Sequence, residues 1–247
     1  MNKTTIVRQQ IWSRLRDYAL PDTHFHYNFA EVIPDFVDSA KATDRVEALP
    51  EVRDSRLLFV TPDNCLTEMR RRLLVAGKTL IVSTYGIYRG FYRLGPDNVP
   101  EGHERYAAWL DGLEYFGSPI TLAEIADLGR FDAMLTGASA VSLDGVRFGK
   151  GHGFFDLEWG MFTDIGIVDD ATPVVAVVHD CQVVEDKLTP SPTDIIVDMI
   201  ATPSRLHRVE RGYPRPRGIH WDRLEPEVIA ATPPLQELQR LRGLLPA

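Results

Sequence analysis

The sequence predicts an α/β protein of three layers, in which a mostly parallel sheet carries helices on both faces. Two observations support this fold: short, uninterrupted apolar runs recur along the chain, and amphipathic helical patterns separate them. Such runs are typical of strands buried on both faces, and their alternation with helices favours parallel connections. With 247 residues, the chain is long enough to bury one well-filled core of this kind.

The elements of the first half follow from the spacing of apolar residues and from the residues that interrupt it. We expect a helix at 5–19 with Ile6, Ile11, Leu15 and Tyr18 inward, a loop at 21–34, a helix at 36–49, a strand at 56–61, a helix at 64–76 that Gly77 ends, and a strand at 79–83. The span 84–118 is rich in glycine, proline and aromatic residues, and it predicts a long excursion over the surface.

The second half continues the alternation. We expect a helix at 121–128, a strand at 132–136, a glycine loop, a helix at 155–168 with Leu157, Met161, Ile165 and Val168 inward, strands at 173–178 and 195–200, and a last helix at 235–241. The whole range 1–247 is predicted to form one domain. Its parts are a helical segment at 1–50, a core at 51–203 and an extension at 204–247 that packs back on the core.

Composition limits the function. The formal charge of −8 argues against general nucleic-acid binding, which needs a basic surface, but it leaves room for a small anion held by a local cluster. Two cysteines are too few for a disulfide framework, and no Cys-x-x-Cys suggests zinc. No signal peptide and no apolar run of roughly 20 residues is seen. We therefore expect a cytoplasmic protein without a membrane partner, and the oligomeric state stays open.

A loop of alternating glycines stands immediately before the predicted helix at 155–168. Its glycines are Gly149, Gly151 and Gly153. Alternating glycines let successive backbone N–H groups turn toward one point, and the start of a helix adds partial positive charge there. The pattern GxGxG matches neither a Walker sequence nor the dinucleotide-binding pattern. It nevertheless predicts a phosphate site.

Charged residues flank this loop. Arg147 and Lys150 supply full positive charges for a phosphate, and Asp156 in the first helical turn suits Mg²⁺, which takes one or two carboxylates besides phosphate oxygens. The alternative is a mobile hairpin whose glycines only form turns, with Asp156 as a helix cap.

Together with its neighbouring motifs, the loop resembles the 5-formyltetrahydrofolate cyclo-ligase (methenyltetrahydrofolate synthetase) family. Members carry Arg-x-Gly-x-Gly-x-Gly-Tyr-Tyr-Asp after a strand like that at 134–138, a later strand ending in Gln as in 175–182, and Asp-x-x-x-Asp-x-x-x-Thr as in 194–202. The likeness covers most of 55–203. It implies a three-layer fold of the cyclo-ligase / NagB-RpiA-CoA transferase-like type, ATP with Mg²⁺, and a folate substrate.

The resemblance also implies roles for single residues. Arg147 and Lys150 are the catalytic candidates, Asp156 is the metal candidate, and Asn64, Thr67 and Gln182 are candidates for substrate binding. The candidates for nucleotide binding are Arg8, Gly149, Gly151, His152, Gly153, Phe154 and Phe155. In the family's reaction, ATP phosphorylates the formyl oxygen of 5-formyltetrahydrofolate, and the ring then closes to 5,10-methenyltetrahydrofolate.

Several positions depart from the family pattern. Phe154 and Phe155 replace paired tyrosines, Leu157 replaces a basic residue, Trp12 replaces an arginine, and Asn64 stands where the family has a glutamate.

The sequences of the segments 148–159, 178–184 and 214–221 resemble a paralogue branch more closely. This branch is called cyclo-ligase-like or methenyltetrahydrofolate synthetase domain-containing, and a link to thiamin metabolism has been proposed for it. Three hypotheses stay open: a folate cyclo-ligase, a paralogue acting on another phosphorylated small molecule, and a non-catalytic binder.

Three other groups have a functional interpretation and a structural alternative. His179-Asp180-Cys181 is an acid–base pair or a hydrogen-bonded strand end, His24 and His26 are metal ligands or a loop pair, and the arginines at 205, 208, 211, 215 and 217 are a second anion site or a solvated face. Arg70 to Arg72 are expected on the exposed side of their helix, and Cys65 and Cys181 are expected to be free thiols.

Overall fold

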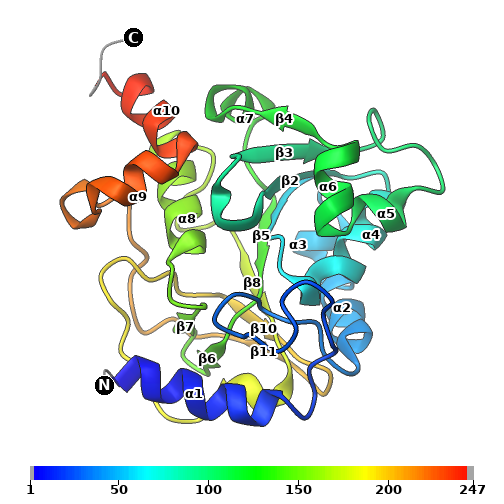
Figure 1. Ribbon diagram of the computed structural model, residues 1–247, viewed down its shortest axis with the longest axis vertical. Coiled ribbons are helices and arrows are strands. Elements are labelled where there is room, and N and C mark those ends of the chain that lie inside the picture. Colours follow the sequence, from blue (N-terminus) through cyan, green and yellow to red (C-terminus); the bar gives the residue numbers. More distant parts are fainter. Residues whose placement is uncertain (1–2, 244–247) are drawn as a thin grey trace.

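The computed structural model describes residues 3–243, and its centre is an eight-stranded sheet (Figure 1). In spatial order the strands are β11 (Leu206–Arg208), β10 (Met199–Ala201), β8 (Val174–Val177), β5 (Ala133–Thr136), β1 (Leu57–Val60), β2 (Thr79–Ser83), β3 (Phe91–Leu94) and β4 (Ser118–Ile120). The five central strands, from β10 to β2, are parallel, whereas β11, β3 and β4 are antiparallel to their neighbours. The predicted mostly parallel sheet is confirmed.

Helices cover both faces of this sheet. Along β1, Leu57 and Phe59 belong to one hydrophobic core, and Leu58 and Val60 belong to the other, as the two-residue period of a strand requires. The helices α7 (Leu122–Leu128), α8 (Phe154–Asp164) and α10 (Pro233–Leu241) pack on the first core. The helices α2 (Ser39–Glu47), α3 (Pro50–Arg53), α4 (Thr67–Val75), α5 (Glu104–Ala107) and α6 (Leu110–Phe116) pack on the second. The predicted three layers are therefore confirmed.

A small second sheet carries the glycine loop. Its order is β7 (Arg147–Phe148), β6 (Ala140–Ser142) and β9 (Val183–Val184). The remaining elements are α1 (Lys3–Leu15), α9 (Pro226–Ala231) and the short 3-10 helices η1 (Asn64–Leu66), η2 (Tyr85–Ile87), η3 (Asp180–Gln182) and η4 (Trp221–Arg223). None of the helices within residues 3–243 has the length and apolar character of a membrane span.

The first helix differs from its prediction. It ends at Leu15 rather than at 19, and Ile6 and Tyr18 are 40% and 41% exposed. Ile11 and Leu15 are buried as predicted. The helix lies at the rim of the molecule (Figure 1) and buries only a narrow stripe, so two of its four expected inward residues face solvent.

The span 84–118 was wrongly predicted as a surface excursion. It contains β3, which pairs antiparallel with β2 from Leu80↔Leu94 to Ser83↔Phe91. Gly86 and Gly90, both with positive φ, turn the chain back after β2. The strand is only four residues long, and this is too short for its period of two to stand out among the surrounding glycines and aromatics.

Two other predicted elements are too long. The helix α8 ends at Asp164 because Gly166 takes a φ of 78° and Ile167 N–H donates to Phe162 O, a helix-ending arrangement. The strand predicted at 195–200 covers only Met199–Ala201 because residues 195–197 cross to the small sheet, where Ile196 bridges to Val146.

Candidate functional site

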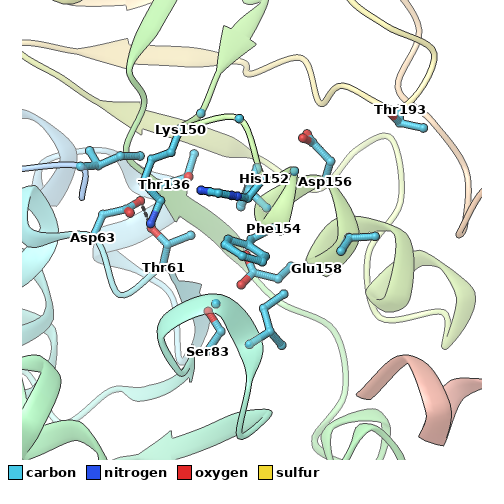
Figure 2. A pocket seen from close by; sticks show the side chains of 18 of the residues that line it. Thr61, Asp63, Ser83, Thr136, Lys150, His152, Phe154, Asp156, Glu158 and Thr193 are labelled. Atoms are coloured by element: carbon cyan, nitrogen blue, oxygen red, sulfur yellow. Dashed lines mark hydrogen bonds between the residues drawn. The ribbon is translucent and has the colours of Figure 1, made fainter. Parts of the chain in front are cut away.

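A cavity of about 490 Å³ lies where three parallel strands end. Thr61 directly follows β1, Ser83 ends β2 and Thr136 ends β5, and all three line the cavity (Figure 2). Ligands of open parallel sheets bind beyond the carboxyl ends of the strands. This cavity is therefore the candidate functional site.

The glycine loop forms one wall of the cavity with its backbone amides free. None of the N–H groups from Gly149 to Gly153 donates a hydrogen bond to another residue within 3–243. Gly151 and Gly153 have φ values of 121° and 69°, which glycine adopts at little cost. Gly153 is the N-cap of α8 and, as a glycine, has no side chain with which to cap the helix. The loop and the helix start thus leave several donors for a ligand.

Arg147 is a buried cation without an acceptor. Its side chain is only 6% exposed, and within the described residues no carboxylate or carbonyl accepts a hydrogen bond from its guanidinium. Its one close partner is the ring of Phe155, whose centroid lies 4.7 Å from Cζ. Buried polar groups nearly always have partners, so this guanidinium is arranged for an anion from outside the chain.

Arg8 brings α1 to the loop. Its Nε donates to Gly149 O at 2.7 Å, and its guanidinium lies 5.6 Å from the ring centroid of Phe148. Burial lowers the pKa of Arg8, although the nearby Asp194 opposes that shift. A second cation therefore stands beside the glycine loop, contributed by an element more than 130 residues away.

Asp156 lies in the first turn of α8 and points toward the same end of the cavity (Figure 2). Its Oδ1 accepts a hydrogen bond from Ile195 N–H at 3.0 Å. Burial raises the pKa of Asp156 to about 6, in spite of the opposing charge of Arg147. Asp194 lines the cavity as well and adds to the rise.

No set of three or more His, Cys, Asp or Glu side chains in the described part of the chain is grouped as a metal site would require. Two carboxyls, Asp156 and Asp194, do line one end of the cavity. This donor set fits an ion such as Mg²⁺ that completes its coordination with phosphate oxygens and water.

Lys150 points from the glycine loop toward Asp63 (Figure 2). Its Nζ donates to Glu31 O at 2.9 Å and lies 4.7 Å from the ring centroid of Tyr85. Burial lowers the pKa of Lys150. The lysine therefore stands between the phosphate end and a second region of the cavity.

We call this second region the inner lobe. Its residues are Phe25, Glu31, Thr61, Asp63, Asn64, Ser83, Tyr85, Phe154 and Glu158. The Tyr85 hydroxyl donates to Glu31 Oε2 at 2.7 Å, and the rings of Phe25 and Tyr85 stack at 5.0 Å. Asp63 Oδ2 accepts from the Thr61 hydroxyl at 2.6 Å. The inner lobe thus combines aromatic faces with carboxylates.

Glu158 is the inner-lobe residue with the least expected environment. It is 2% exposed, one carboxyl oxygen bonds with Ser83, and Oε2 has no hydrogen-bond partner within the described residues. Burial raises the pKa of Glu158 to about 8. Glu158 was not predicted as a site residue, although one signal was present: it stands three residues after Phe155 and four before Phe162, on the buried stripe of its helix.

The structure separates the three predicted substrate-binding residues. Asn64 lines the cavity, and its Nδ2 donates to Asp22 Oδ2 at 2.7 Å. Gln182 is buried elsewhere, with Nε2 donating to Ala138 O at 2.5 Å and its oxygen accepting from His179 N–H at 2.7 Å. Neither Gln182 nor Thr67 is among the residues that line the cavity.

The remaining predicted residues lie at the cavity. His152 is exposed, and its ring stacks on Phe154 at 5.3 Å. Phe155 is buried and packs in the core cluster that includes Phe59. All seven residues predicted for nucleotide binding line this one cavity.

The prediction that Arg70 lies on an exposed helix side is wrong. Arg70 is 2% exposed and donates to the carbonyl oxygens of Thr61, Asp63 and Ala108 at 2.7, 3.0 and 2.9 Å, and to the Thr67 hydroxyl. A long side chain next to the irregular backbone after β1 satisfies carbonyls that no strand partner reaches. Arg70 therefore fixes the backbone that presents Asp63.

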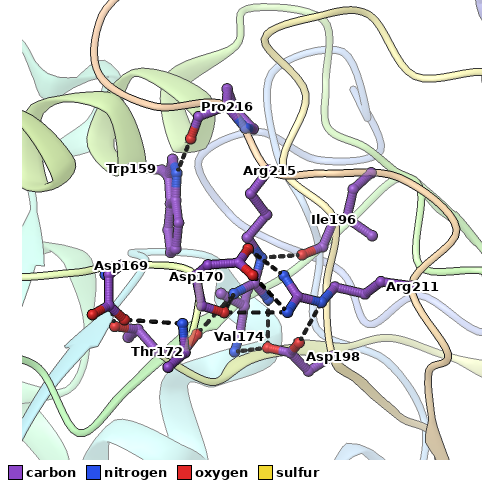
Figure 3. A network of polar contacts seen from close by, with 11 residues as sticks. Trp159, Asp169, Asp170, Thr172, Val174, Ile196, Asp198, Arg211, Arg215 and Pro216 are labelled. Carbon is purple, nitrogen blue, oxygen red and sulfur yellow. Dashed lines mark hydrogen bonds and ion pairs between the residues drawn. The ribbon is translucent and has the colours of Figure 1, made fainter.

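The prediction of a solvated arginine face after residue 204 is wrong for Arg215. It is 6% exposed, donates to Ile196 O and Thr172 O, and pairs with Asp198 (Figure 3). Arg211 joins the same network through Asp170 and Asp198. These two arginines are neutralised within the chain and do not form a second anion site.

The C-terminal segment 216–228 forms another wall of the cavity. Trp159 Nε1 donates to Pro216 O at 2.9 Å, and Asp164 Oδ2 accepts from Ile219 N–H at 3.0 Å, so the segment is docked on α8. His220 and Arg223 of this segment line the cavity. The sequence analysis did not identify them, because only the docking of the extension brings them there.

The other candidate groups lie outside the cavity. His179 stacks on Tyr18 at 4.1 Å and accepts a hydrogen bond from Cys181 N–H, and Asp180 accepts one from the Thr202 hydroxyl. The motif 179–181 is thus a hydrogen-bonded strand end, the structural alternative to an acid–base pair. Cys65 and Cys181 are free thiols, as predicted, and burial raises the pKa of both.

His24 and His26 lie in a turn at 22–26. The Asp22 carboxylate accepts hydrogen bonds from the backbone N–H groups of His24 and Phe25. His24 and His26 are therefore a loop pair, which was the alternative to a pair of metal ligands.

Comparisons with known proteins agree on one family. A sequence model of the 5-formyltetrahydrofolate cyclo-ligase family matches residues 1–203. The chain is 33% identical to the methenyltetrahydrofolate synthase domain-containing protein of Homo sapiens over 237 residues and 31% identical to that of Bos taurus over 236 residues. These alignments cover 94% of this chain but 60% and 61% of the relatives, so the chain spans about three fifths of their length.

The fold agrees with a solved structure as well. The NMR structure of Aquifex aeolicus 5,10-methenyltetrahydrofolate synthetase superposes with a TM-score of 0.51 and 19% sequence identity, covering 88% of this chain and 98% of that one. The fold is therefore that of a methenyltetrahydrofolate synthetase.

Proposed function

Because the chain belongs to the 5-formyltetrahydrofolate cyclo-ligase family, we propose that its glycine loop binds the phosphates of ATP and that the inner lobe binds the molecule to be phosphorylated. The reaction of the family is the conversion of 5-formyltetrahydrofolate and ATP to 5,10-methenyltetrahydrofolate, ADP and phosphate. Residues for both reactants would then share one cavity at the ends of β1, β2 and β5.

One observation carries the proposal: Arg147 is a buried guanidinium for which the described chain offers no acceptor, next to a run of backbone amides that are equally free. Burying such donors without partners is unfavourable, whereas a phosphate supplies several acceptors and the compensating charge. A phosphate bound there would also meet the N-terminus of α8.

Each charged group has a place in this reaction. The γ-phosphoryl group moves from ATP to the formyl oxygen of the substrate, N10 then attacks the activated carbon, and phosphate leaves as the ring closes. Arg147 and Arg8 would neutralise charge on the phosphates. Lys150, which stands between the loop and the inner lobe, would stabilise the phosphoryl group during transfer.

The residues present also fit a magnesium ion. Asp156, with Asp194 beside it, would hold the ion together with phosphate oxygens, and the ion supplies further neutralisation of charge when bound.

A second candidate is a paralogue without cyclo-ligase activity that binds or acts on another phosphorylated small molecule, with thiamin metabolism as one setting. Two observations favour it. Asn64, which stands in place of the family's glutamate, uses its amide to bond Asp22. Trp12, which stands in place of an arginine, donates to Ser139 Oγ at 3.2 Å and adds no charge to the phosphate end.

An absorbance assay distinguishes the two candidates. Methenyl product formed from 5-formyltetrahydrofolate and ATP supports the cyclo-ligase. Its absence, together with a thermal shift caused by ATP and Mg²⁺, supports the paralogue, since a ligand of the native state raises apparent stability. If ATP neither shifts the melting temperature nor binds in calorimetry, the proposed phosphate site is refuted.

A further inference from the structure

We propose that Glu158 determines which small molecule enters the inner lobe, and that its free carboxyl oxygen binds the amino-substituted edge of a planar nitrogen heterocycle. This inference rests on the proposed function, since it takes the inner lobe as the site of the molecule that meets ATP. It assigns a residue and a class of ligand to that lobe.

The first support is the unpaired atom. Oε2 of Glu158 is fully buried and has no hydrogen-bond partner within residues 3–243, although the carboxyl belongs to a residue that lines the cavity. A buried carboxyl oxygen without a partner weakens the fold. A leucine at this position would suit the apolar stripe of α8 better, so the carboxyl is explained by a ligand group that pairs with it.

The second support is the shape of the surroundings. Glu158 lies beside the ring of Phe154 and opposite Ser83 (Figure 2), and the same lobe contains the stacked rings of Phe25 and Tyr85. Flat aromatic faces complement a flat ring, which they can contact with many atoms at once.

The third support is the charge balance of the lobe. Its carboxyls are Glu31, Asp63 and Glu158, and no lysine or arginine is among its nine residues; Lys150 lies at its border, where Nζ donates to Glu31 O. Each of these carboxyls accepts a hydroxyl hydrogen bond within the chain, but Oε2 of Glu158 is the buried carboxyl oxygen among them that has no partner within residues 3–243. A lobe of this kind suits a ligand that presents N–H groups rather than a further anion. The amino group of such a ring can donate an N–H to this free oxygen.

The first experiment compares ligands on the unaltered protein by isothermal calorimetry. The probes are thiamin and oxythiamin, which carries an oxo group in place of the 4-amino group, and 5-formyltetrahydrofolate with its analogue that lacks the 2-amino group. We expect at least one amino compound to bind and to bind at least about tenfold more tightly than its partner, the usual effect of one lost hydrogen bond to a charged or buried group. Equal affinities within both pairs, or no binding by any probe, would overturn the proposal.

The second experiment changes the residue. Glu158→Leu should lower the affinity for the bound amino compound at least about tenfold while the affinity for ATP stays within about twofold, and Glu158→Gln should recover most of the loss because its amide still offers a donor and an acceptor. Unaltered binding by the leucine variant would overturn the proposal. An equal loss of ATP affinity would do so as well, since Glu158 would then act on the loop.

The two proposals fail separately. A protein that binds ATP but discriminates no amino compound refutes only the role of Glu158. A protein that binds an amino compound through Glu158 without binding ATP refutes only the phosphate site. Should the leucine variant not fold, the comparison of ligands on the unaltered protein decides the question.

Discussion

Replacement of Arg147 by methionine should leave the fold intact and remove most of the ATP affinity. The side chain makes no hydrogen bond within the described residues, so the change deletes a buried charge and leaves no internal hydrogen-bond partner unsatisfied. Folding stability should therefore change by less than about 1 kcal/mol or rise. A guanidinium that binds a phosphate by two charge-assisted hydrogen bonds contributes about 3 kcal/mol, which corresponds to a loss of affinity of about 150-fold.

Arg215 is the matched control, because it is likewise only 6% exposed but bonds with Asp198, Ile196 O and Thr172 O. Arg215→Met should destabilise the protein by about 3 kcal/mol or more. Urea unfolding measures the stability of both variants, and calorimetric titration with ATP and Mg²⁺ measures the affinity of Arg147→Met. If Arg147→Met binds ATP as tightly as the unaltered protein, or unfolds as readily as Arg215→Met, the reasoning is wrong.

Three other predictions concern the site, the surface and the packing of the extension. Lys150→Ala should reduce turnover by about 100-fold with little effect on melting temperature, while the exposed control Lys187→Ala changes neither, and near-normal kinetics would contradict the assigned role. Hydrogen bonding by arginines of α4 lowers the pKa of Glu68 from 4.5 to about 2, so the ionised form adds stability that is complete above pH 4.5 and is lost as the pH falls toward 2. Glu68→Gln should thus lower the unfolding free energy by about 1 kcal/mol at pH 7 and hardly at all at pH 2, and a difference independent of pH would rule this out. Gly160→Ala places a Cβ 2.7 Å from Ile219 Cδ1 and 3.0 Å from the carbonyl oxygen of Gly218. It should destabilise the protein by about 1–3 kcal/mol and expose the C-terminal segment 216–228 to proteolysis. Resistance to proteolysis equal to that of the unaltered protein would show that the segment is not docked as described.

The elements that the sequence predicted well have strong local signals. The strands near 57–60, 79–83 and 133–136 are uninterrupted apolar runs, and the helix 67–75 shows a clear buried face before Gly77. The elements that were missed are short or lie at the margins. Strand β3 and helix α9 have four and six residues, and in such short segments a period of two or of 3.6 is not distinguishable from chance.

The site could be predicted where its chemistry lies in one continuous segment. The loop 147–156 holds its glycines, cations and metal candidate within ten residues, and all of them line the cavity. Asp63 was overlooked, although its place three residues after a parallel strand was a usable signal. Gln182, which a matching motif predicted for substrate binding, bonds backbone groups and is not among the residues that line the cavity.

The layers of the sheet, the position of the glycine loop before a helix and the resemblance to a family could be read from the sequence, because each depends on the order and spacing of neighbouring residues. Three features required the folded chain: Arg147 has no acceptor within residues 3–243, Arg70 is buried, and Glu158 shares an inner lobe with Ser83. Burial and pairing are properties of atoms from distant segments. They exist only once the chain has brought those segments together, and no local pattern records them.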